Sequence, residues 1–173
     1  MKVLVSTTIG LHVLAAVAIQ AQQPRVKVAG DTAGAPAGCS TAAAVAAIAE
    51  WFTAFQAADS AGLARLSATR SPRGFGVTMG KFTPADPFVR LESLQAVLQH
   101  ARRRAREHER LTLQGIRFFG WRGRVLGFMP YFTRSADDLG PSAHAGFGKA
   151  EYYCGQGIAI LNLGPRPARD PGL

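Results

Sequence analysis

The chain has 173 residues, a formal net charge of +9 at pH 7, and hydrophobic residues at 47% of its positions. This length suits one domain, and the apolar share is enough to fill its core. The composition therefore excludes a small scaffold that needs several disulfides or a structural metal in order to fold. The positive charge could favour anionic partners, but it comes largely from arginines spread along the chain.

Residues 1–21 have the order of a secretory signal peptide. Lys2 supplies a positive start, Val3 to Ala18 is mostly apolar, and small residues recur up to Ala21. The apolar run is shorter than the ~20 residues that span a bilayer, and the alternative is an uncleaved helix that serves as an anchor. We expect cleavage near Ala18 or Ala21, a secreted or periplasmic protein, and no stable membrane insertion after cleavage.

Two stretches flank the expected domain. Residues 22–38 are rich in Gly, Pro and Ala without periodicity, which predicts a flexible leader. Residues 165–173 contain three prolines and predict a disordered tail. The folded domain is therefore expected over residues 39–164.

Three helices are predicted, over about 40–59, 60–68 and 91–107. In each of them apolar residues recur at three- and four-residue steps. Ser40 or Thr41 can cap the first helix, and Asp59 or Ser60 can cap the second.

The period changes to two in the C-terminal half. Long strands are predicted over 110–121, 124–135 and 149–163, and a short one near 75–82. Gly123 suits a tight hairpin turn, and Pro130 predicts a bulged or edge-like strand. This order predicts an α+β fold in which helices cover one face of a curved antiparallel sheet and enclose a cavity.

Four segments carry a family resemblance, namely AAVAAIAEWFTAFQAADSAGLARLSA, LESLQAVL, LTLQGIRFFGWRGRVLGFMPYF and GKAEYYCGQGIAILNL. In this order they resemble the nuclear transport factor 2-like family, which includes SnoaL-like and ketosteroid isomerase-like proteins. The resemblance covers roughly residues 39–165. It implies a cone-shaped sheet wrapped around about three N-terminal helices, a pocket, and often a dimer. It implies no reaction, because none of the family's catalytic carboxylates matches a residue here.

Aromatic and amide side chains are the candidates for lining such a pocket. They are Trp51, Phe55, Phe118, Tyr131, Tyr152 and Gln156. Phenol and amide groups in an apolar pocket can orient a small ligand. The alternative is ordinary packing in the core and on the sheet.

Cys39 and Cys154 are the only cysteines in the chain. Because exported proteins keep disulfides, we expect a bond between them, with two separate thiols as the alternative. A catalytic thiol is disfavoured because no histidine accompanies either cysteine in a known pattern.

The arginine-rich run HARRRAREHER is interpreted as a solvated helix face and not as a nucleic-acid site, because glutamates are interspersed and no aromatic residues alternate with the arginines. Asp137, Asp138 and His144 are interpreted as a polar turn, so no metal site and no cofactor are expected.

The first functional hypothesis is an exported domain that binds a small molecule in an amphipathic pocket. The second is an isomerase or hydrolase with an acid/base residue in that pocket, for which Glu50, Asp59 and Glu151 are the nearest acids. The third is a dimerising interaction module. A small ligand and a second copy of the chain are thus the partners left open, and no nucleic acid is expected.

Overall fold

The computed structural model describes residues 26–170, so the predicted signal peptide lies outside the described residues. The elements are β1 (Lys27–Asp31), α1 (Thr41–Gln56), α2 (Ser60–Leu66), β2 (Gly76–Met79), β3 (Val89–Leu91), α3 (Leu94–Arg106), β4 (Arg110–Arg122), β5 (Val125–Ser135), the 3-10 turn η1 (Asp137–Leu139), β6 (His144–Tyr153) and β7 (Gly157–Pro165). No helix within the described range is long and apolar enough to cross a membrane.

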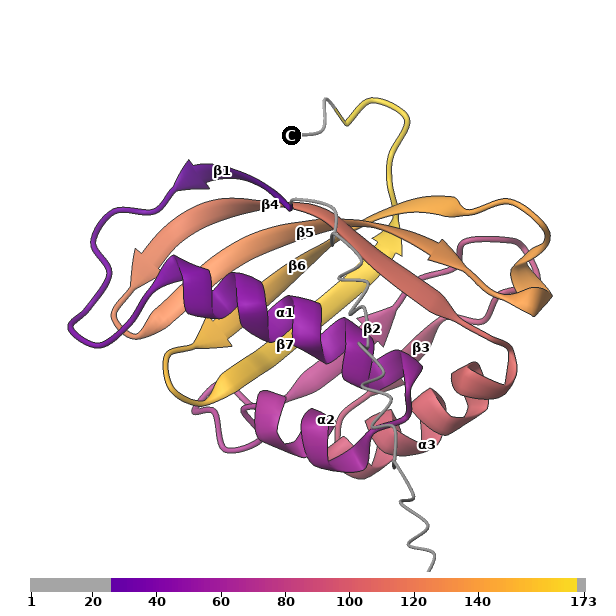
Figure 1. Cartoon of the computed structure of the whole chain (residues 1–173), viewed down its shortest axis with the longest axis horizontal. Coiled ribbons are helices and arrows are strands. Elements are labelled where there is room, and N and C mark those ends of the chain that lie inside the picture. The colour runs from indigo at the N-terminus through magenta and orange to yellow at the C-terminus, as the bar shows by residue number, and fades with distance from the viewer. Residues whose placement is uncertain (1–25, 171–173) are drawn as a thin grey trace, which may run out of the picture.

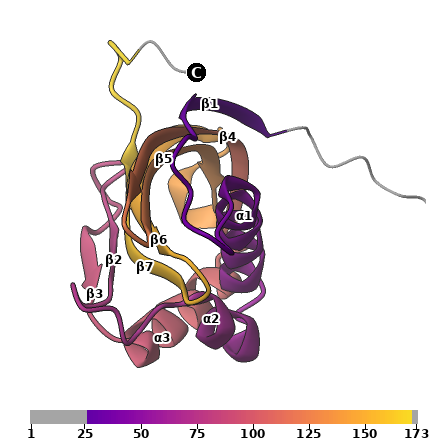
Figure 2. The ribbon, with the colours of Figure 1, turned by 90° about the vertical axis from the view of Figure 1, so that its left-hand side faces the viewer.

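The strands form one sheet in the order β1-β4-β5-β6-β7-β2-β3. Strands β4 to β7 are a long antiparallel meander, whereas the β1–β4 and β2–β7 pairs are parallel. The helix α1 lies across one face of this sheet, and the sheet curls around it (Figures 1 and 2). The predicted α+β fold is confirmed, with a sheet that is mixed and not purely antiparallel.

The space inside the curl is filled by side chains. Helix α1 contributes Trp51, Phe52 and Phe55, which are at most 1% exposed, and β5 contributes Phe128 and Phe132. Each such side chain stabilises the fold by about 1.5–3 kcal/mol when fully buried. The alternation of inward and outward residues along β4 to β7 therefore distinguishes an inner face, packed on the helices, from an outer face.

The first two helices begin where the sequence predicts. The Ser40 hydroxyl accepts a hydrogen bond from the Ala43 amide (3.1 Å), and Asp59 accepts hydrogen bonds from the first amides of α2. Ser93 caps α3 in the same way, which shortens the predicted third helix at its start. These oxygens satisfy amides that have no partner inside the helix.

The predicted strand over 149–163 is in fact two strands. A turn at residues 154–156 separates β6 from β7 and folds them into a hairpin. Gly157 has a φ of +108°, and a Cβ there would collide with the Leu66 carbonyl. The prediction was wrong because it extended one strand through Gly155 and Gln156, where the chain turns.

The predicted leader is also partly regular structure. Residues 27–31 form β1, which lies parallel to β4 at the edge of the sheet. Gly30 makes this approach possible, because any side chain there would meet the Phe118 carbonyl. The predicted tail differs too: the Arg166 amide donates to Ala145 (2.9 Å), and Arg166 lies over the Tyr131 ring.

Pro130 lies in a strand with neighbours on both sides, although its sequence predicts an edge or a bulge. Pro130 faces Ile116 across the β4–β5 pair, and the β5–β6 ladder is interrupted at Met129 and Pro130. The missing amide hydrogen is thus accommodated by a gap in the ladder.

A disulfide joins Cys39 and Cys154, whose Cα atoms are 5.6 Å apart. The pairing predicted from the sequence is therefore confirmed. The bond fastens the residue that precedes the α1 cap to the turn between β6 and β7.

Candidate functional site

The aromatic residues predicted to line an inner pocket are part of the core. Trp51 stacks on Phe55 with ring centroids 5.2 Å apart, and the Trp51 indole donates to the Ser67 hydroxyl. Phe118 packs against Phe128 at 6.1 Å. These contacts show how the residues stabilise the fold, and a ligand contact by them stays a prediction.

The other three predicted residues lie apart from one another. Tyr152 is mostly buried in the core and, with the exposed Gln156, borders a shallow hollow beside α1. Tyr131 is on the outer face of the sheet, where the Arg166 guanidinium covers its ring at 5.5 Å. Trp51, Phe55, Phe118 and Tyr152 thus belong to one core cluster, whereas Tyr131 and Gln156 lie outside it.

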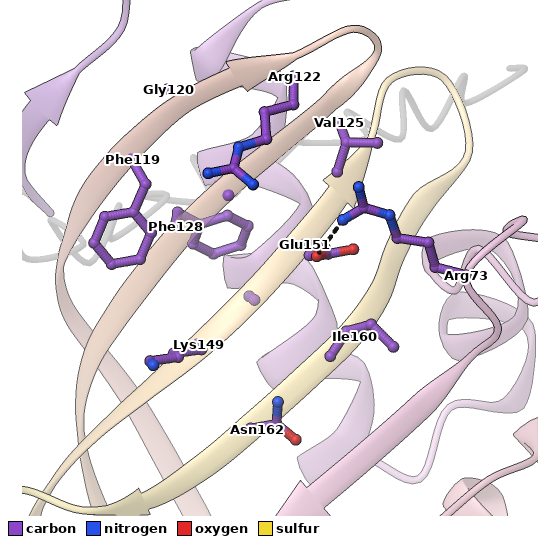
Figure 3. A pocket seen from close by; sticks show the side chains of 12 residues that line it. Arg73, Phe119, Gly120, Arg122, Val125, Phe128, Lys149, Glu151, Ile160 and Asn162 are labelled. Carbon is purple, nitrogen blue, oxygen red and sulfur yellow. Dashed lines mark hydrogen bonds and ion pairs between the residues drawn. The ribbon is translucent and has the colours of Figure 1, made fainter.

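A hollow of about 490 Å³ lies on the outer face of the sheet (Figure 3). It crosses the last residues of β4, the first residues of β5 and the middle of β6 and β7, and the loop before β2 forms one of its walls. Its lining combines charged, amide and apolar side chains, namely Arg73, Phe119, Arg122, Val125, Lys149, Glu151, Ile160 and Asn162.

The backbone of β4 and β5 creates this hollow. Alternation along β4 places Phe118 inward and Phe119 outward, and a register shift between Phe118 and Gly120 leaves Phe119 without a partner on β5 and 54% exposed. Gly127 pairs with Gly120 on one side and with Glu151 on the other, and it has no side chain to fill the floor. Two glycines and one bulge thus leave space on a face that side chains would otherwise cover.

The charges around the hollow are unbalanced. Three cations and one carboxylate line it, which leaves a net charge of +2. Arg73 pairs with Glu151 at 3.1 Å, whereas Arg122 and Lys149 form no ion pair within residues 26–170. Because unpaired cations beside an apolar floor attract anions, the site is suited to a negatively charged group.

Glu151 also has a free hydrogen-bonding atom. Its Oε1 accepts from Arg73, while its Oε2 is buried without a partner among the described residues. A buried polar atom without a hydrogen bond costs about 1–3 kcal/mol. A donor on a ligand could recover part of this cost if the side chain turned toward the hollow.

A network of buried, charged side chains lies at one end of the core. Arg134 binds Glu109 through two hydrogen bonds of 3.1 Å and Asp86 through one of 2.6 Å. Arg104 binds both oxygens of Asp138 and also donates to Glu109. These charges are occupied by one another, so this network stabilises the fold and leaves no cation free for a ligand.

This network corrects the interpretation of the arginine run as a solvated face at Arg104, whereas Arg102, Arg103 and Arg106 are exposed. Arg104 is 5% exposed, and it pairs with Glu109, five residues along the chain, and with Asp138, which is 34 residues away. Burial would lower the pKa of Arg104, but the hydrogen bonds and charges of Asp138 and Glu109 raise it above its usual value. The hydrogen bonds from Arg104 lower the pKa of Asp138.

His100 is buried as well, although the sequence suggests a solvated position. It is 6% exposed, its Nδ1 accepts from Arg103 (2.7 Å), and its Nε2 has no partner in the described part of the chain. Burial and then the positive charges of Arg103, Arg104 and Arg134 lower the pKa of His100 to about 4. The imidazole is therefore neutral at pH 7.

Comparisons with known proteins bear on the fold. No family model and no curated protein matches the sequence. Among solved structures, an NTF2-like protein of unknown function from Mesorhizobium loti aligns over 82% of this chain and all of its own, with 14% identity and a TM-score of 0.52. The chain has the nuclear transport factor 2-like fold.

Other proteins with related structures have different roles. A protein from Xanthomonas campestris, assigned as a calcium/calmodulin dependent protein kinase II association domain, shares 14% identity over 80% of this chain and 96% of its own, with a TM-score of 0.52. The orange carotenoid protein of Anabaena, solved with canthaxanthin, shares 10% identity over 91% of this chain, with a TM-score of 0.52. This chain spans only 43% of that protein. Such similarities show the NTF2-like fold and no activity.

In this NTF2-like domain the three acids considered for catalysis have different surroundings. Glu50 is exposed and pairs with Arg65, and Asp59 caps α2. Of these three, only Glu151 borders the outer hollow. No sequence pattern marked this hollow, because its lining comes from β4 to β7 and a loop that only the fold brings together.

Proposed function

We propose that this NTF2-like domain binds a small molecule with an anionic group and an apolar part in the outer hollow. The observation that carries this proposal is the pair of cations, Arg122 and Lys149, that face the hollow without an ion pair in the described structure. Phe119, Val125 and Ile160 provide apolar contact beside them. This combination is typical of sites for amphipathic ligands.

Two polar groups support hydrogen bonding to the same ligand. The Asn162 amide can donate or accept, and Glu151 has an oxygen without a partner. A ligand with a hydroxyl or amine next to its anionic group would use both. The orange carotenoid protein of Anabaena, solved with canthaxanthin, illustrates that a protein containing this fold can hold a small molecule.

We also propose that the domain acts outside the cytoplasm. The disulfide between Cys39 and Cys154 supports this, because such bonds persist mainly in oxidising compartments. The signal-like order of residues 1–21 supports the same location.

The proposal predicts that hexanoate binds and that Arg122→Gln weakens its binding by about tenfold, which is ~1.4 kcal/mol. The measurement is isothermal titration calorimetry at low salt, with nuclear magnetic resonance titration of labelled protein to locate the site. The matched control is Arg102→Gln, since Arg102 is an exposed arginine on α3 that does not line the hollow.

A second variant tests the shape of the hollow independently of its charge. Gly127→Val places a side chain on the floor of the hollow and suits a strand, because a Cβ at Gly127 would lie 3.8 Å from Phe119. It should abolish binding while the fold persists. Unchanged affinity in both Arg122→Gln and Gly127→Val would refute the proposal.

A second copy of the chain is the competing occupant of this face. Phe88 and Phe119 are 59% and 54% exposed, which is unusual for large apolar side chains. Native mass spectrometry of the same sample distinguishes the two. A dimer that Phe119→Ser dissociates, without any retained small molecule, would favour the interaction module.

The enzyme hypothesis depends on Glu151, because the other two candidate acids lie away from the hollow. Its ion pair with Arg73 and its free oxygen are compatible with a proton acceptor, but the same contacts suit a binding residue. Binding is therefore the function that this geometry supports best.

A further inference from the structure

A second hollow of about 520 Å³ adjoins the first on the outer face. It lies over β7, β2 and β3 and is bordered by Phe75, Thr78, Phe88 and Arg90. Arg73, Ile160 and Asn162 line both hollows, so the two lie side by side. We call this pair of hollows the outer groove.

The two ends of this groove differ in charge. At the second end Arg90 pairs with Glu92 at 2.8 Å, so the cation there is already neutralised. The exposed Phe88 and the half-buried Phe75 provide aromatic contact. The first end has the unpaired Arg122 and Lys149. The groove is therefore cationic at one end and aromatic at the other.

We propose that the ligand is an elongated amphipathic anion. Its carboxylate or phosphate head lies at Arg122 and Lys149, and its apolar tail crosses Ile160 to reach Phe88. This inference rests on the proposed function and adds the length and direction of the ligand. A fatty acid and an alkyl phosphate share this chemistry, and the experiment distinguishes the two heads.

The strand order sets the length. Lys149 is on β6, and Phe88 directly precedes β3, which is three strands away in the order β6-β7-β2-β3. Neighbouring strands are about 4.8 Å apart, so a tail that runs from Lys149 to Phe88 must extend roughly 14 Å, whereas Arg122 on β4 is two strands farther from Phe88. Hexanoate is too short to reach both ends, whereas dodecanoate can.

The test is calorimetry on the full, disulfide-bonded protein with hexanoate, dodecanoate and dodecyl phosphate, each below its micelle concentration. Because each buried methylene adds to the apolar contact, dodecanoate should bind at least ~10-fold more tightly than hexanoate. The comparison of dodecanoate with dodecyl phosphate then identifies the preferred head.

Phe88→Ser provides the decisive variant. It should reduce dodecanoate affinity by at least ~5-fold and leave hexanoate affinity unchanged, since only the long tail reaches Phe88. Val28→Ser is the matched control, because Val28 is 52% exposed on β1 and lines neither hollow. Circular dichroism confirms that both variants remain folded.

Each outcome has one meaning. Equal affinity for hexanoate and dodecanoate, or an equal effect of Phe88→Ser and Val28→Ser, overturns the elongated ligand while the proposed function stands. No binding of any of the three compounds overturns both proposals. The inference is supported if dodecanoate binds more tightly than hexanoate and if Phe88→Ser, but not Val28→Ser, removes this difference.

Discussion

The sequence of α3 does not indicate that His100 is buried. Val97, His100, Ala101 and Arg104 share the buried face of α3, and Leu94 and Leu98 beside them are half-buried against the core. On this face Arg104 binds Glu109 and Asp138, which lie outside the helix. His100 lies close to the Phe55 ring.

The buried His100 predicts a loss of stability in mild acid. Its pKa is about 4 in the folded chain and 6.5 when unfolded, so the unfolded state binds more protons between these values. Stability should therefore fall as the pH decreases from 6.5 to 4, by about 3 kcal/mol if this group acts alone. Urea denaturation at a series of pH values measures the slope, and His100→Asn should flatten it. An identical slope in both proteins would show that His100 is not the cause.

At the scale of elements, the segment before α1 depends on contacts with distant strands. Strand β1 has only five residues and pairs only with β4, and Cys39 is bonded to a residue 115 positions away. Neither the pairing of β1 nor the bond of Cys39 follows from local sequence preference. The disulfide supplies the constraint that holds this segment against the sheet.

Removing the disulfide should therefore destabilise the domain. In the chain-entropy model, a closed loop of this length contributes about 4–5 kcal/mol. The Cys39→Ser/Cys154→Ser protein should unfold at least ~8 °C lower in calorimetry, given about 2–4 °C per kcal/mol for a domain of this size. Hydrogen exchange should increase first in β1 and the first turn of α1. Unchanged exchange in these segments would contradict the proposed constraint.

At the scale of the whole molecule, the charged network joins α3, β5 and the segment between β2 and β3. Glu109 accepts hydrogen bonds from Arg104 on α3 and Arg134 on β5, while Asp86 reaches Arg134 from the segment between β2 and β3. Phe82 covers the Arg134 guanidinium at 4.8 Å. The network therefore holds the helical side and the sheet together at one end of the curl.

Glu109→Gln should cost several kcal/mol. Glu109 is 1% exposed, and its loss would leave two buried arginines short of a compensating charge. Breaking one partner of a buried ion pair typically costs about 3–5 kcal/mol. Glu92→Gln is the control, because Glu92 forms an exposed pair with Arg90 that contributes little. Chemical denaturation should separate the two variants clearly, and equal midpoints would refute a stabilising role for the network.

Local chemistry was sufficient to predict the helix caps at Ser40 and Asp59, the two-residue period of β4 and β5, and the pairing of the two cysteines. Each of these features depends on neighbouring residues or on residue type. The turn before Gly157, the inward position of Arg104 and the outer groove depended on the folded chain. The Gly157 backbone packs closely against the Leu66 carbonyl, Arg104 binds Asp138 from a distant segment, and Gly120 and Gly127 leave space between strands. Such causes act between residues far apart in sequence, so no local pattern can contain them.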